Sequence, residues 1–186
     1  IILLYTFRGG IKTIVWTDTL QTTFLLAALV LTIVFIVNDM GVNLNIIWHN
    51  IDTAGYTKMF NTNWQDNKFF VKQIISGIFI TITMTGLDQD MMQKNLSCKT
   101  LKDAQQNMFV FSIILLIVNA LFLFLGGLLC IYATQKGVDL SSMLTDKIYP
   151  TVAFELLPPI AGIVFIIGLI AAGYSSADGT LTSLTT

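Results

Sequence analysis

Four apolar segments, each close to the length needed to cross a lipid bilayer, constrain this chain more than any other feature. A helix needs roughly 20 mostly apolar residues to cross the hydrocarbon core, because every backbone amide there has to be hydrogen-bonded inside the helix. One of the four segments is almost unbroken and reads FSIILLIVNALFLFLGGLLCIYA. The predicted spans are approximately residues 14–37, 69–86, 108–133 and 158–180. The sequence therefore predicts an all-α integral membrane protein.

The composition excludes two other classes of protein. Hydrophobic residues make up 54% of the chain and charged residues 11%, whereas soluble domains average about 25% charged residues. The net charge of −1 and the lack of a basic stripe argue against a nucleic-acid partner. The expected environment is the lipid bilayer, with several passes through the plasma (inner) membrane.

The segments between the spans indicate an orientation. Residues 38–68 are rich in tryptophan and tyrosine, so we expect a short interfacial or re-entrant helix within this loop. Residues 87–107 form a polar, amphipathic connector. Positive residues in short loops favour the cytoplasmic side, and this connector holds Lys94, Lys99 and Lys102. We therefore expect residues 87–107 in the cytoplasm and residues 38–68 in the extracellular space or periplasm.

The cysteines and the chain ends add two expectations. Cys98 and Cys130 fall near opposite ends of the third predicted span, so we expect no disulfide between them. The amino-terminal residues IILLYTFRGG have no basic region and no cleavage site of a signal peptide. They read as the tail of a helix ending at Gly9–Gly10, and we expect the chain to be an internal piece of a longer protein.

Ionisable residues inside a predicted span are costly and mark candidate functional positions. Asp18 shares a helix face with Gln21 and Thr22, at spacings of three and four residues. The alternative is that Asp18 only caps or anchors a helix start at the membrane interface. Asp178 lies in a run of small hydroxyl residues that continues the last apolar segment, YSSADGTLTSLTT.

The hydroxyl run has two interpretations. Hydroxyl and carbonyl oxygens with one or two carboxylates suit a small alkali cation that has to bind and then leave. Alternatively, the serines and threonines bond to backbone carbonyls one turn earlier, or they pack one helix against another. His49, the single histidine, has no neighbour at a metal-ligand spacing, and no phosphate-binding loop or nucleophile motif is present. From the sequence, we therefore expect that the protein is not an enzyme.

Three stretches resemble the sodium:solute symporter family, which carries sugars, proline, pantothenate and iodide. They are GGIKTIVWTDTLQ, GLDQDMMQKNLSCKTLKDAQ and YPTVAFELLPPIAGIVFIIGLIAAGYSSADGTLTSLTT. The resemblance implies two inverted repeats of five helices each, the LeuT-like fold, with ions and solute bound near the membrane midplane. This chain would supply about four of those helices, as part of one transmembrane domain, and the remaining helices of the full-length protein would be its partners.

The same resemblance implies a sodium site. The family's sodium ligands match the carbonyl of Ala172 and the hydroxyls of Ser175 and Ser176. The expected bound ion is Na+, with further ligands from a helix outside this chain. Asp18 matches an acidic residue that faces a second ion or an exit pathway. Asp178 stands where relatives often carry a hydroxyl residue, and it would add charge to that second position.

The solute is less constrained. Positions that contact sugar in the sugar carriers correspond here to Thr81, Met84 and Leu115, which argues against the same sugar contacts. The sequence predicts sodium-coupled import of a small polar solute, which could be a sugar, polyol, sialic acid, amino acid or organic acid. The alternative is a symporter-like sensor domain of a histidine kinase.

Overall fold

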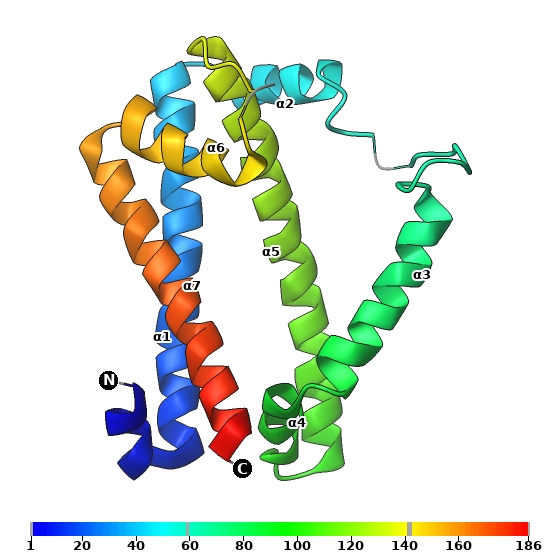
Figure 1. The fold of residues 1–186 in the computed structure, drawn as a ribbon, viewed down its shortest axis with the longest axis vertical. Helices are drawn as coiled ribbons and strands as arrows, with labels where there is room; N and C mark the ends of the chain where they lie inside the picture. Colours follow the sequence, from blue (N-terminus) through cyan, green and yellow to red (C-terminus); the bar gives the residue numbers. More distant parts are fainter. Residues whose placement is uncertain (1, 59, 141–142, 186) are drawn as a thin grey trace.

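The computed structural model is helical throughout the residues that it describes. Its described backbone comprises residues 2–58, 60–140 and 143–185, and its described side chains exclude those of residues 2–14, 44, 90, 178 and 182–185. Figure 1 shows the arrangement, in which η1 and η2 are single π-helical turns. The elements are α1 (Ile2–Met40), α2 (Leu44–Thr53), α3 (Phe70–Thr81), η1 (Ile82–Gly86), α4 (Gln89–Leu96), α5 (Leu101–Gln135), α6 (Thr145–Thr151), η2 (Val152–Leu156) and α7 (Pro159–Thr185).

Among the described residues, three helices are long and apolar enough to cross a membrane. They are Val15–Met40, Leu101–Gln135 and Pro159–Leu181, and they overlap three of the predicted spans, whose bounds across the membrane stay predictions. The remaining predicted span corresponds to Phe70–Gly86, a shorter apolar helix. Its crossing of the membrane stays a prediction.

Two helix starts differ from the prediction. The expected break at Gly9–Gly10 is wrong, because α1 is helical from Ile2 to Met40. Helix α5 begins at Leu101, seven residues before the predicted start of its span, because Thr100 caps it and its hydroxyl accepts a hydrogen bond from the backbone N–H of Asp103 at 3.2 Å. The start of α7 at Pro159 agrees with the preference of proline for the first turn of a helix.

The long helices alternate in direction along the chain. In Figure 1, α1 and α5 run from the end of the molecule that holds both termini and α4 towards the end that holds α2 and α6, and α3 and α7 run back. The expected short helix in residues 38–68 is α2. Cys98 and Cys130 are both free and lie near opposite ends of α5.

Helices α1 and α7 form the most extensive helix pair among the described elements. Their close approach depends on small residues, since a Cβ atom added to Gly168 would lie 2.7 Å from the Cβ of Ala28. Small residues at membrane helix interfaces allow backbones to approach in this way. The packing of this pair determines how close Asp18 of α1 lies to Ser175 of α7.

The core lies at the end of the molecule that holds α2 and α6. Tyr132 and Leu128 of α5 and Ile36 of α1 are fully buried there, packed with residues of α2 and η2. The buried hydroxyl of Thr32 donates to the carbonyl of Ala28 at 2.8 Å and lies 2.7 Å from the hydroxyl of Tyr149 on α6. These contacts fix α6 and η2 against α1 and α5.

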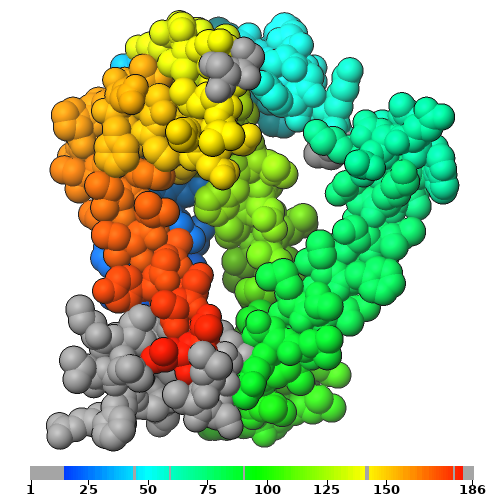
Figure 2. Space-filling model, viewed as in Figure 1, coloured from blue at the N-terminus to red at the C-terminus, as the bar shows by residue number. Residues whose placement is uncertain are grey.

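Helix α3 stands apart from this core. It has no buried residue, and Figure 2 shows open space between α3 and α5 along much of their length. Its side chains are therefore free to contact lipid or other helices.

Candidate ion-binding site

Three helices meet at the carboxylate of Asp18. The ammonium of Lys94, in the last turn of α4, lies 2.6 Å from Oδ2 of Asp18. The hydroxyl of Ser175, on α7, donates to Oδ1 of the same carboxylate at 3.2 Å. The Asp18 side chain is only 18% exposed, and a carboxylate held that far from water needs charged or hydrogen-bonding partners. Asp18 therefore joins α1 to α4 and α7.

The second part of the candidate site begins at the next residue of α7, Ser176. The hydroxyl of Ser176 donates to the carbonyl of Ala172 at 3.2 Å, and the hydroxyl of Thr180 donates to the carbonyl of Ser176 at 2.8 Å. The second interpretation of the hydroxyl run predicted such bonds, from serine and threonine hydroxyls to backbone carbonyls of the preceding turn. They also hold the Ala172 and Ser176 oxygens, two of the predicted sodium ligands, next to each other.

The structure brings Asp18 and Ser175, two of the predicted site residues, into direct contact. The neighbouring polar residues differ in their surroundings. The side-chain oxygen Oε1 of Gln21, one turn after Asp18, is buried and has no hydrogen-bond donor among the described residues, whereas Thr22 is exposed. The side chain of Asp178 lies outside the described residues, so its role as a second ion ligand stays a prediction.

The types of oxygen predicted for this site suit a monovalent cation. A carboxylate, two hydroxyls and a backbone carbonyl are hard oxygen donors with a single negative charge among them, which favours an alkali ion over a transition metal. Among the described residues, no group of three or more histidine, cysteine or acidic side chains could hold a metal ion. Binding of an alkali ion at these oxygens stays a prediction.

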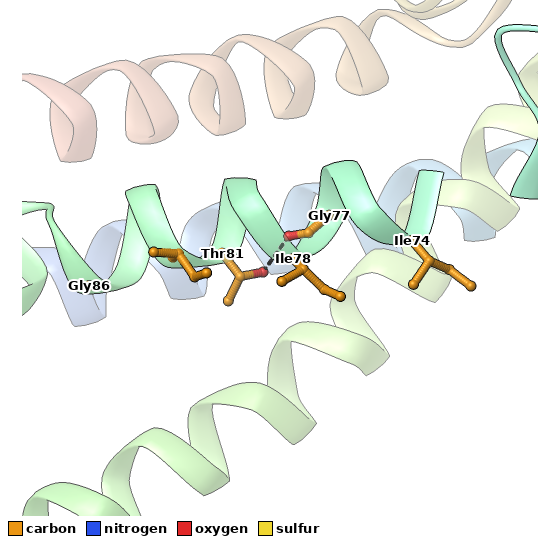
Figure 3. A pocket seen from close by; sticks show the side chains of 6 residues that line it. Ile74, Gly77, Ile78, Thr81 and Gly86 are labelled. Atoms are coloured by element: carbon orange, nitrogen blue, oxygen red, sulfur yellow. Dashed lines mark hydrogen bonds between the residues drawn. The ribbon is translucent and has the colours of Figure 1, made fainter. Parts of the chain in front are cut away.

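The predicted solute-facing residues lie on α3 and η1. Thr81 lines an open, mostly apolar groove of about 610 Å³ with Ile74, Ile78 and two glycines (Figure 3). The Thr81 hydroxyl donates to the carbonyl of Gly77 at 2.8 Å, and Met84 is 67% exposed within the π-helical turn η1. π-Helical turns are frequent at functional sites because they break the regular helical hydrogen bonding.

Two polar contacts were not predicted from the sequence. Lys94 had been considered only as a marker of orientation, and nothing in its spacing showed that it would reach Asp18. At the opposite end of the molecule, Asp39 accepts hydrogen bonds from Tyr132 at 2.6 Å and pairs with Lys136 at 2.8 Å. The hydrogen bond to Asp39 raises the pKa of Lys136. The sequence signal for this second contact is the spacing of Tyr132 and Lys136, which lie four residues apart near a helix end.

Comparison with known proteins places this geometry in context. The profile of the sodium:solute symporter family matches residues 1–186. The chain is 26% identical to the sodium/sialic acid symporter SiaT of Proteus mirabilis and 26% identical to the sodium/sialic acid symporter NanT of Aliivibrio fischeri, each over 98% of this chain. It is 24% identical to sodium-coupled monocarboxylate transporter 1 of the mouse, over 96% of this chain. No solved structure matches the chain significantly.

These relatives are transporters by name, which fits a protein that is not an enzyme and does not favour the sensor alternative. The chain spans 37% of the length of the two sialic acid symporters and 30% of the length of the mouse transporter.

Proposed function

Because this chain belongs to the sodium:solute symporter family, we propose that it is part of a sodium-coupled symporter that imports a small polar solute by alternating access. Sodium is then a transported ion rather than a resident cofactor. Its gradient supplies the free energy, and it can shift the protein between outward-open and inward-open states only by binding one of them more tightly.

One observation carries the proposal: Asp18 and Ser175 meet on α1 and α7, and the next residue, Ser176, bonds to the carbonyl of Ala172. We assign the carbonyl of Ala172 and the hydroxyls of Ser175 and Ser176 to a sodium site, which helices outside this chain complete. The carbonyl oxygen can bind an ion while it stays in the helix, because it has two lone pairs.

We assign Asp18 to a second ion position or to the ion's exit pathway. The hydroxyl of Ser175 contacts the carboxylate of Asp18. An ion that leaves the Ala172 site could therefore move from this hydroxyl to this carboxylate while it keeps at least one oxygen ligand. Asp178, on the same helix as Ser175, is the candidate for additional negative charge there.

The proposed fold is that of an inverted-repeat, LeuT-like transporter in the plasma membrane. Phe70–Gly86 would be a further membrane span, the second of four in chain order, and would start the second repeat. Its π-helical turn would be the discontinuity where solute binds. Thr81 and Met84 are the solute-facing candidates. The exposed faces of α3 and α5 would pack on the remaining helices of the full-length protein.

The relatives' names direct the search for a solute. Sialic acid and monocarboxylates both carry a carboxylate, so we propose an organic acid or an acidic sugar as the first class to test.

The test uses the full-length protein in proteoliposomes. Uptake of labelled N-acetylneuraminic acid, lactate and an uncharged sugar is measured with an inward sodium gradient, and with potassium or choline gradients of equal strength. Uptake that accumulates one acid only with sodium supports the proposal. Equal uptake under all three gradients, across a panel that includes amino acids and polyols, would exclude sodium coupling.

A further inference from the structure

Lys94 brings a positive charge into the candidate ion site from outside the two helices that carry the ion ligands. Its ammonium lies 2.6 Å from Asp18, and its side chain is 30% exposed. Lysine and sodium carry the same charge, so either can neutralise the carboxylate. We propose that Lys94 is a tethered counter-cation that occupies Asp18 when sodium is absent and competes with sodium for it. This inference rests on the proposed sodium coupling.

The competition follows from the way the carboxylate is shared. Oδ2 of Asp18 faces Lys94 and Oδ1 faces the hydroxyl of Ser175, so the ammonium and a proposed sodium ligand hold the same group. A sodium ion between Ser175 and Asp18 would lie close to the ammonium, and two cations on one half-buried carboxylate repel each other. The ion therefore binds well only when Lys94 moves away.

Lys94 can leave Asp18 through its own side chain, while the backbone of α4 stays in place. It is a helix of eight residues between η1 and α5, and the Asp88 side chain caps it by accepting from the N–H of Met91. Lysine has a flexible four-carbon stem and a compact charge, so it can leave a carboxylate by rotation of its side chain alone.

An unpaired oxygen close by strengthens the assignment of this place to a cation. Gln21 lies one turn after Asp18 on α1, and its buried Oε1 has no donor among the described residues. A sodium ion near Asp18 could bind this oxygen, whereas the Lys94 ammonium lies on the carboxylate. A sodium ion could therefore use one oxygen, Oε1 of Gln21, in addition to the carboxylate oxygen that the Lys94 ammonium contacts.

The consequence is a cycle in which the carboxylate is always paired. Sodium displaces Lys94 when the site fills, and Lys94 returns as the ion leaves, which keeps Asp18 neutralised and favours release over rebinding. This assigns Lys94 a role in setting sodium affinity rather than in binding the ion.

The first test needs no mutation. The full-length protein is treated with an amine-reactive reagent in sodium chloride or in potassium chloride, and labelling of Lys94 and Lys99 is followed by mass spectrometry. Sodium should speed the labelling of Lys94 by roughly fivefold or more, the lower range of allosteric coupling between two ligands, and leave Lys99 unchanged. Equal or slower labelling of Lys94 in sodium would overturn the proposal.

The second test uses Lys94→Met, with Lys99→Met as the matched control. Removing the competitor should lower the sodium concentration for half-maximal thermal stabilisation by a similar factor. It should also lower stability in sodium-free buffer, because the charge of Asp18 is then no longer neutralised by a cation. An unchanged or raised sodium requirement in Lys94→Met, with normal sodium stabilisation of the wild type, would overturn the tethered-cation role alone. Absence of any sodium effect in the wild type would overturn both this inference and the proposed function.

Discussion

At the scale of single residues, the two adjacent serines of α7 have different partners. Ser175 bonds across to Asp18 on α1, whereas Ser176 bonds within its own helix to the carbonyl of Ala172. A hydroxyl that joins two helices contributes to stability and to ion binding, but an exposed hydroxyl that bonds to its own helix contributes little to stability. The two serines should therefore be separable by mutation.

We predict that Ser176→Ala weakens sodium binding roughly tenfold, equivalent to about 1.4 kcal/mol, and leaves the sodium-free melting temperature unchanged. Ser175→Ala should weaken sodium binding and also lower the sodium-free melting temperature, because it removes a hydrogen bond to a charged group worth about 1.5 kcal/mol or more. Thermal unfolding across a sodium titration measures both quantities.

Ser112→Ala is the matched control, because the Ser112 hydroxyl also donates to a carbonyl of its own helix, that of Met108 at 2.9 Å. It should change neither quantity. Unchanged sodium affinity in Ser176→Ala would remove that hydroxyl from the ion site.

The residues of the candidate site could be predicted to different degrees. Asp18 was found because a carboxylate in an apolar span is costly, and the α7 serines were found from their place in a family motif. Lys94 could not be found in either way. It lies in a polar connector where lysine is ordinary, and its contact with Asp18 depends on how α4 packs against α7 and α5.

At the scale of elements, the packing of α1 on α7 depends on Gly168, which leaves no room for a Cβ beside Ala28. We predict that Gly168→Ala destabilises the α1–α7 pair by about 1–3 kcal/mol, because the added Cβ would lie 2.7 Å from the Cβ of Ala28 and force the helices apart. The double variant with Ala28→Gly should recover most of the loss. Thermal unfolding of the full-length protein measures both effects.

Gly173→Ala, in the same helix, is the control because a Cβ there meets nothing within 4 Å in the described structure. It should be neutral or slightly stabilising, since alanine favours helix more than glycine does. Equal effects of the two glycine substitutions would contradict the close packing of α1 on α7.

The loop between α2 and α3 is organised around Asp66. Its carboxylate accepts from the backbone N–H of Lys68 at 2.9 Å and from the side-chain amide of Asn61 at 2.6 Å. These hydrogen bonds hold the pKa of Asp66 below its ordinary value of 3.8. A lowered pKa means that the carboxylate stabilises the loop above pH 3.8 and that this stabilisation is lost as the pH falls through the lower, folded value.

We predict that amide hydrogen exchange in residues 61–70 speeds up as the pH falls below about 4, after correction for the intrinsic pH dependence of exchange. In Asp66→Asn, which has no titrating carboxylate, the corrected exchange rate should not depend on pH in this range. A corrected rate that stays constant in the wild type would show that the loop does not depend on this carboxylate.

Element boundaries show what hydrophobic pattern alone could predict. The apolar lengths located the long helices, and Pro159 located the start of α7. The pattern placed a break at Gly9–Gly10 where α1 continues, because two glycines weaken a helix without requiring it to end. It also missed α6 and η2, since their short, mixed segments are held by packing of Val152 and Tyr149 against distant helices.

At the scale of the whole molecule, packing and polar chemistry lie at opposite ends. The buried core lies beside α2 and α6, and the carboxylate of Asp18 joins α1, α4 and α7 at the end that holds the termini (Figure 1). Alternating direction of the long helices could be predicted from the order of apolar and polar segments. The separation of core and site could not, because it depends on which helices pack together.

The central claim is that a sodium ion binds at the serines of α7. The most direct test is the melting temperature of the full-length protein in increasing sodium chloride, with potassium chloride and choline chloride as controls for ionic strength, for the wild type and for Ser175→Ala/Ser176→Ala. We predict a rise that is specific for sodium in the wild type and absent in the double variant, because a ligand stabilises the state that binds it. A sodium-specific rise of the same size in the double variant would place the ion elsewhere, and no specific rise in the wild type would contradict sodium coupling.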